Sequence, residues 1–194
     1  MSERFSKNTK LSHFPTLSFG TEATGFRQYF PHTGTTGAPK TGPQLEEKGL
    51  YMLLVNLGPT IKCHWALCIA MDDTSGLLFQ QALFGMDWKF IMENNNVILT
   101  DDPLGALKLG SVESIDDEWL KRITQCLRGT VIEGEFTCRT WALAALYELA
   151  NEGFIGMIAD WGTIREIEQE AQDLVLAVWT AEQKIVRRSQ FYSG

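Results

Sequence analysis

The sequence predicts an α+β fold in which a small antiparallel sheet packs against helices. Short apolar runs separated by turn residues fill the region from 50 to 112, and longer segments with helical periodicity follow it. Of the 194 residues, 44% are hydrophobic, which is enough for one substantial core. We therefore expect a single α+β domain over residues 49–194.

Residues 1–48 differ from this domain and are predicted to form an N-terminal arm. The stretch 31–44, PHTGTTGAPKTGPQ, is dense in Gly, Pro and Thr and is typical of a loop. The aromatic residues that precede it are more numerous than a fully disordered tail usually carries. We therefore expect the arm to dock rather than to remain free.

Four runs are predicted to be strands. The first, 50–58, is LYMLLVNLG and ends before Pro59; the second, 63–71, is CHWALCIAM. The residues DDTSG then form a hairpin turn that leads into 77–84, and ALKLGSV at 106–112 is the fourth strand.

Three helices are predicted after the strands. Ser114 opens the first with the capping pattern SIDD, and a short extended segment, 130–136, follows that helix. The second begins near Cys138 and ends before Gly153. The third starts at the capping box TIRE, 163–166, and its apolar face continues toward Ile185.

Composition excludes several functional classes. The net charge is −7 and no basic patch stands out, so we expect no nucleic-acid partner. No stretch approaches 18 uninterrupted apolar residues, so we expect no membrane association. The four cysteines include no CxxC pair, which favours a reduced, soluble, cytoplasmic protein without a cofactor.

Cys138 is the first candidate for chemistry. If Thr137 caps the helix, Cys138 is its first residue, where free N–H groups and the positive end of the helix dipole favour thiolate over thiol. Thiolate is the nucleophilic form, and the neighbouring Arg139 could add positive potential. The alternative is that Cys138 is one of the many free cysteines that are simply buried.

His64 is the candidate base. The other two histidines, His13 and His32, lie in the arm, whereas His64 lies in a predicted strand. A nucleophilic cysteine needs an imidazole to take its proton, and the imidazole needs a polar group to orient it. A single histidine at a strand start is otherwise most often structural.

The hairpin supplies the orienting group. If DDTSG closes it symmetrically, residue 71 pairs with 77 and the even-numbered residues of both strands share a face. Gln80 then lies on the same side as His64, with Gln81 as the alternative if the register differs by one. Either glutamine could instead face solvent.

Residues near these candidates have predicted roles of their own. Trp141, three residues after Cys138, could wall a substrate pocket together with Arg139. Trp65 must face away from His64 in a regular strand and is predicted to lie in the core. A zinc site with Cys63, His64 and Cys138 is disfavoured, because adjacent strand residues point to opposite faces and CxxC is missing; we expect no metal.

From Tyr51 to Ile155 the sequence resembles a family of small fungal proteins of unassigned biochemistry. Those carry a YHWAL strand, a G-x-YH strand, a KIG-V strand and a W/F-x-C-x-x-WV-x-x-AL helix, in the order in which CHWALCIA, the 77–84 strand, ALKLGSV and GEFTCRTWALAAL occur here. More distantly, this order resembles the circularly permuted papain-like group that includes lecithin:retinol acyltransferase. The resemblance implies a permuted papain-like fold.

The resemblance also implies roles for individual residues. His64 matches the histidine of the HWAL strand and Cys138 matches the cysteine at the helix start. Gln80 occupies the position of the second histidine, which is a departure from the pattern, although many papain-like enzymes use Asn or Gln there.

The leading hypothesis is a cysteine-dependent acyl-transfer or hydrolytic enzyme acting on a small amide or ester, which the resemblance would place in fungal specialised metabolism. Cys138 would attack the acyl carbon, and His64 would take the thiol proton and later protonate the leaving group. One alternative is a non-catalytic binding module on the same scaffold. Another is a cyclase or isomerase that uses His64 as acid and base, with Cys138 structural.

Overall fold

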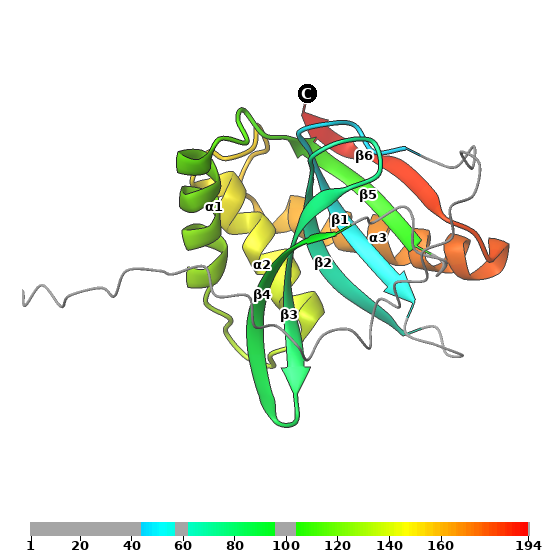
Figure 1. Ribbon diagram of the computed structural model, residues 1–194. Helices are drawn as coiled ribbons and strands as arrows, with labels where there is room; N and C mark the ends of the chain where they lie inside the picture. Colours follow the sequence, from blue (N-terminus) through cyan, green and yellow to red (C-terminus); the bar gives the residue numbers. More distant parts are fainter. Residues whose placement is uncertain (1–43, 57–61, 96–103, 194) are drawn as a thin grey trace, which may run out of the picture. The chain divides into compact units, whose positions relative to one another are not determined.

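The computed structural model describes residues 44–56, 62–95 and 104–193 (Figure 1). The predicted arm, including His13 and His32, lies outside these ranges except for residues 44–48. Within the described ranges, no helix is both long and apolar enough to cross a membrane.

The fold is α+β, a six-stranded and mostly antiparallel sheet with three helices packed against it. The strands lie in the order β4-β3-β2-β1-β5-β6, and only β5 and β6 pair in parallel. The strands are β1 (Gly49–Asn56), β2 (Cys63–Ala70), β3 (Gly76–Phe84), β4 (Asp87–Asn95), β5 (Leu104–Ser111) and β6 (Ile185–Ser193). The helices are α1 (Asp117–Gly129), α2 (Cys138–Asn151) and α3 (Trp161–Ala181).

All three helices contribute to one core on one side of the sheet, which we call the helix side (Figure 1). The strand residues in this core alternate along each strand, as Trp65, Leu67 and Ile69 do on β2. The intervening side chains point to the opposite side, which we call the far side. Its members include Tyr51, Leu53, Val55, His64, Ala66, Cys68, Gln80, Ala106 and Lys108.

The predicted hairpin exists, but its register is shifted by two residues. Leu77 pairs with Ile69 rather than with residue 71. The turn has the expected five residues but lies one residue earlier, at 71–75 instead of 72–76, and within it the Asp72 carboxylate accepts hydrogen bonds from the backbone N–H groups of Thr74 and Ser75. A shift of two preserves the alternation of faces, so even-numbered residues of β2 and β3 do share a side.

Helix α2 begins where the sequence predicts. Thr137 is its N-cap, the Thr137 side chain accepts from the N–H of Thr140 at 3.0 Å, and the Thr140 hydroxyl accepts from the N–H of Thr137 at 2.9 Å. Cys138 is therefore the first residue of the helix. Gly153, with φ of 74°, follows its end in the left-handed conformation that was expected there.

The other two helix starts differ from prediction. Asp116, not Ser114, caps α1, and the Ser114 hydroxyl donates to the Asp116 carboxylate instead. Asp160 caps α3, which therefore begins at Trp161, two residues before the predicted Thr163. Asp satisfies the free N–H groups at a helix start as well as Ser or Thr does. In both helices the N-cap is the aspartate directly before the first helical residue.

Two strands were not predicted. Strand β4 follows β3 through a two-residue turn that starts at Gly85, with φ of 63°, and β6 replaces the expected continuation of the last helix. Helix α3 ends at Ala181 because Glu182 adopts a left-handed conformation. Ile185, expected on that helix, begins β6. The predicted extended segment 130–136 is not a strand.

Candidate functional site

The structure brings His64 and Gln80 together on the far side of the sheet. The His64 Nε2 atom lies 2.7 Å from the Gln80 Oε1 atom. His64 lies on β2 and is half-buried, whereas Gln80 lies on β3 and is fully buried. The contact confirms the shared face that the sequence predicts for these residues.

A third residue, Glu93 of β4, extends the contact into a chain. The Gln80 Nε2 atom donates a hydrogen bond of 2.8 Å to Glu93 Oε1. An ionised carboxylate only accepts, so the amide nitrogen of Gln80 must face Glu93 and its oxygen must face His64. The amide oxygen also only accepts, so His64 Nε2 carries the proton.

This arrangement leaves His64 Nδ1 as the unprotonated ring nitrogen. Among the described residues, nothing forms a hydrogen bond to Nδ1. Burial lowers the pKa of His64 below its ordinary value of 6.5, and the hydrogen bond with Gln80 opposes this effect only in part. At neutral pH the imidazole is therefore neutral, with a free lone pair on Nδ1 that can accept a proton.

Cys138 lies on the other side of the sheet. It is half-buried and packs against the helix-side core, as does Cys63 of β2. Burial raises the pKa of the Cys63 thiol to about 11, against a smaller opposing effect of the Trp65 side chain. Cys138 and Arg139 at the start of α2 are close enough to have still smaller effects, Cys138 raising this pKa and Arg139 lowering it. Because neighbouring strand residues point to opposite faces, the side chain that faces Cys138 belongs to Cys63 and not to His64.

The structure therefore does not bring the expected nucleophile and base together. No hydrogen bond or ion pair joins His64 to Cys138 within the described ranges. Both residues lie at the ends of their elements that the sequence predicts. The sequence does not determine which face of β2 helix α2 covers.

The two expected substrate-binding residues also lie on the helix side. Trp141 is fully buried, its ring packs edge-on against Phe90 at 5.9 Å, and its Nε1 has no hydrogen-bond partner in the part of the chain that the structure describes. Arg139 is half-exposed and forms an ion pair of 3.5 Å with Glu168 of α3. Trp65 lies in the core, as predicted.

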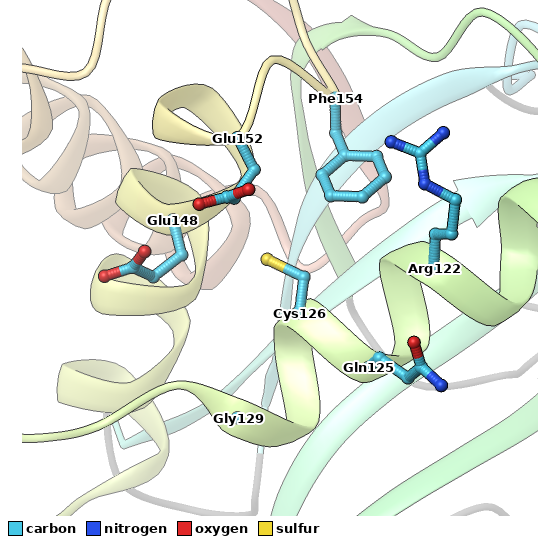
Figure 2. Close-up of a pocket in the computed structure, with 7 residues that line it drawn as sticks. All are labelled: Arg122, Gln125, Cys126, Gly129, Glu148, Glu152 and Phe154. Atoms are coloured by element: carbon cyan, nitrogen blue, oxygen red, sulfur yellow. The ribbon is translucent and has the colours of Figure 1, made fainter. Parts of the chain in front are cut away.

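A separate pocket of about 400 Å³ opens between α1 and α2 (Figure 2). Cys126 of α1 points toward Glu148 of α2 and toward Glu152, the C-cap of that helix, and Arg122 lies over the ring of Phe154 at 5.6 Å. Burial, with a smaller effect of the two carboxylates, raises the pKa of Cys126 to about 11. The pocket thus holds a protonated thiol, and none of the residues selected from the sequence lines it.

Glu93 is the site residue that sequence reasoning missed, because strand β4 was missed. Two signals were present. Gly85 and Met86 form a two-residue turn of the kind that joins hairpin strands, and Trp88, Phe90 and Met92 lie at every second position, with Asp87, Lys89 and Glu93 among the residues between and beside them. Together they place Glu93 on the same side as Gln80.

The chain was compared with protein-family models, characterised proteins and solved structures, and no match was found in any of the three comparisons.

Proposed function

We propose that the protein is an enzyme that moves a proton on a small organic molecule, with His64 as the general acid and base. This corresponds to the isomerase or cyclase alternative. One observation carries the proposal: the chain from His64 through Gln80 to Glu93, which fixes the tautomer and leaves Nδ1 without a hydrogen bond to any described residue.

In the proposed step, His64 Nδ1 removes a proton from an acidic carbon of the substrate, and the electron pair passes into an adjacent carbonyl group. The imidazolium that forms keeps its proton on Nε2, which continues to donate a hydrogen bond to Gln80 Oε1. The Glu93 carboxylate polarises the Gln80 amide and so stabilises the positive ring through one intervening group. Nδ1 then returns the proton to a different atom of the same molecule, which completes an isomerisation with no net change in protons.

Solvent exchange tests this proposal without knowledge of the natural substrate. The protein is incubated in deuterium oxide with a panel of 1,3-dicarbonyl compounds and α-keto acids, and deuterium incorporation is followed by NMR. We expect His64→Ala to slow exchange by about 10²-fold or more, and Cys138→Ala to leave it unchanged. Exchange that is equal in wild type and His64→Ala on every compound would contradict the proposal and favour the binding module.

Cysteine-dependent acyl transfer to or from a small amide or ester, in a permuted papain-like fold, is the second candidate. The position of Cys138 as the first residue of α2, with a complete capping box, favours it. Because His64 in its observed position faces away from Cys138, this mechanism needs another base, or a rearrangement of β2 that brings His64 to Cys138. Activity on an ester that is lost in Cys138→Ala and kept in His64→Ala would favour a cysteine nucleophile with another base.

A further inference from the structure

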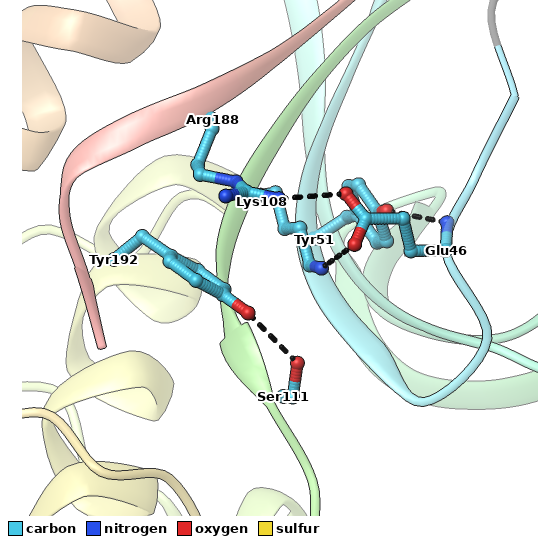
Figure 3. Close-up of polar contacts among 6 residues, drawn as sticks. All are labelled: Glu46, Tyr51, Lys108, Ser111, Arg188 and Tyr192. Atoms are coloured by element: carbon cyan, nitrogen blue, oxygen red, sulfur yellow. Dashed lines mark hydrogen bonds and ion pairs between the residues drawn. The ribbon is translucent and has the colours of Figure 1, made fainter. Parts of the chain in front are cut away.

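A second polar cluster lies on the far side of the sheet, where β5 and β6 meet (Figure 3). Lys108 Nζ of β5 lies 2.6 Å from Glu46 Oε2, and Arg188 Nη2 of β6 lies 3.1 Å from Glu46 Oε1. The Tyr192 ring contacts both cations, with Nζ at 4.8 Å and the guanidinium carbon at 4.6 Å from its centre. Its hydroxyl lies 3.3 Å from that of Ser111.

The charges in this cluster do not balance. Lys108 and Arg188 carry two positive charges, and Glu46 is the one carboxylate within ion-pair distance of either among the described residues. One positive charge is therefore left over, in a chain whose net charge is −7. A local positive excess of this kind attracts anions.

The two cations differ in their access to solvent. The Lys108 side chain is 4% exposed, whereas those of Arg188 and Glu46 are 57% and 58% exposed. A buried ammonium group needs an anionic partner, so a negative group must remain beside Lys108. Since the Glu46 side chain reaches in from solvent, its contact is screened and can be exchanged for another anion.

The geometry of the Glu46 carboxylate shows what such an anion would be. Each of its oxygens takes a different cation, so the two cations are spaced to bind the two oxygens of one planar or tetrahedral oxyanion. The Tyr192 hydroxyl lies beside them as a further donor. Carboxylate and phosphate groups share this chemistry.

We propose that Lys108, Arg188 and Tyr192 form a binding site for the carboxylate or phosphate group of a small molecule. Glu46 is an internal competitor that occupies the site in this structure. The inference does not depend on His64, which lies on the opposite flank of β1.

Isothermal titration with inorganic phosphate, at constant ionic strength set with sodium chloride, tests the site. Glu46→Gln preserves the shape of the side chain and removes the competing charge, so it should bind phosphate at least tenfold more tightly than wild type. Arg188→Gln in the Glu46→Gln background should reverse that gain. Glu168→Gln, which breaks the comparable ion pair with Arg139, is the matched control and should bind as wild type does. Acetate in a parallel titration distinguishes carboxylates from phosphates.

Equal affinity of wild type and Glu46→Gln for both anions would overturn the inference, as would an equal gain in Glu168→Gln. If Glu46→Gln does not fold, the unfolding temperature of wild type and of Arg188→Gln is compared in phosphate and in chloride. Phosphate should raise it in wild type only. An equal rise in both proteins, or no rise in wild type, would overturn the inference.

Discussion

The Gln80 amide donates a hydrogen bond of 2.8 Å to the Glu93 carboxylate, and this contact decides where the proton of His64 lies. An amide can present either its nitrogen or its oxygen to an imidazole. Because the Gln80 amide nitrogen donates to the Glu93 carboxylate, the amide oxygen faces His64. The His64 Nε2 atom lies 2.7 Å from this oxygen and must donate to it. The position of the proton on Nε2 is thus a consequence of the Glu93 carboxylate, which acts through Gln80.

The first prediction tests this dependence. Glu93→Gln replaces an acceptor by a group that can also donate, so Gln80 is no longer held in one orientation and both tautomers of His64 become populated. Correlation of the imidazole nitrogens with the ring protons by NMR measures the tautomers, and His64→Gln assigns the signals. Glu118→Gln on the exposed start of α1 should change nothing. A proton on Nδ1 in the wild-type protein would contradict the proposed chain.

The second prediction concerns stability and pH. Burial lowers the pKa of His64 in the folded protein, whereas the unfolded chain keeps a value of about 6.5. The unfolded chain therefore binds more protons between these two values, and the free energy of unfolding falls as the pH drops through 6.5 toward the lowered pKa. Above about pH 7.5 both states are neutral and the slope due to His64 vanishes.

Urea unfolding of wild type and His64→Gln between pH 5 and pH 8 measures this slope. The other histidines are present in both proteins, so the difference between the two curves isolates His64. We expect the difference in the free energy of unfolding to be constant above about pH 7.5. Below about pH 6.5 the wild type should become less stable relative to His64→Gln. Parallel curves throughout would show that the imidazole is as readily protonated in the folded chain as in the unfolded one.

Much of the architecture could be predicted because local patterns determine it. The apolar runs of β1, β2, β3 and β5 and the capping box of α2 need no knowledge of distant contacts. The pairing of His64 with Gln80 was predicted even though the turn was misjudged, because a register error of two residues leaves every side chain on its own face. An error of one would have favoured Gln81.

The separation of Cys138 from His64 could not be predicted in the same way. Residues 63 to 70 of β2 are largely buried on both sides, so their hydrophobic pattern does not reveal which face the helices cover. That choice depends on how α2 packs, through contacts such as that between Trp141 and Phe90. Phe90 belongs to β4, the strand that the sequence reasoning omitted.

The third prediction is the order of cysteine labelling. Burial raises the pKa of Cys63 and Cys126 to about 11 and that of Cys68 to about 12, so at pH 8 these three are protonated thiols that react slowly with iodoacetamide. We expect Cys138, half-buried at the start of α2, to be alkylated first. Mass mapping of the modified peptides over time measures the order.

His64→Ala separates the two candidate functions in the same experiment. Since His64 faces away from α2, the labelling rate of Cys138 should be unchanged in this variant. Cys63→Ala, which removes the side chain that does face Cys138, should change the rate. A several-fold loss of Cys138 reactivity in His64→Ala would restore the cysteine mechanism with His64 as its base.

The fourth prediction compares two adjacent glutamines. Gln80 is fully buried and makes two hydrogen bonds, to His64 and Glu93, whereas Gln81 on the helix side is 8% exposed and makes none within the described ranges. Gln80→Leu leaves the half-buried imidazole N–H of His64 without its acceptor and removes one donor from the Glu93 carboxylate, so it should lower the free energy of unfolding by about 1–3 kcal/mol. Gln81→Leu removes an amide that has no hydrogen bond among the described residues, so it should be close to neutral.

Urea unfolding at pH 7.5 measures both variants, and each is the control for the other because volume and strand propensity change alike. A double variant, Gln80→Leu with Glu93→Leu, should recover part of the loss, since both ends of one buried hydrogen bond are then removed together. Equal destabilisation by Gln80→Leu and Gln81→Leu would mean that the chain from His64 to Glu93 adds no stability beyond side-chain packing. The orientation of Gln80 would then depend on steric fit, and the tautomer of His64 would no longer depend on Glu93.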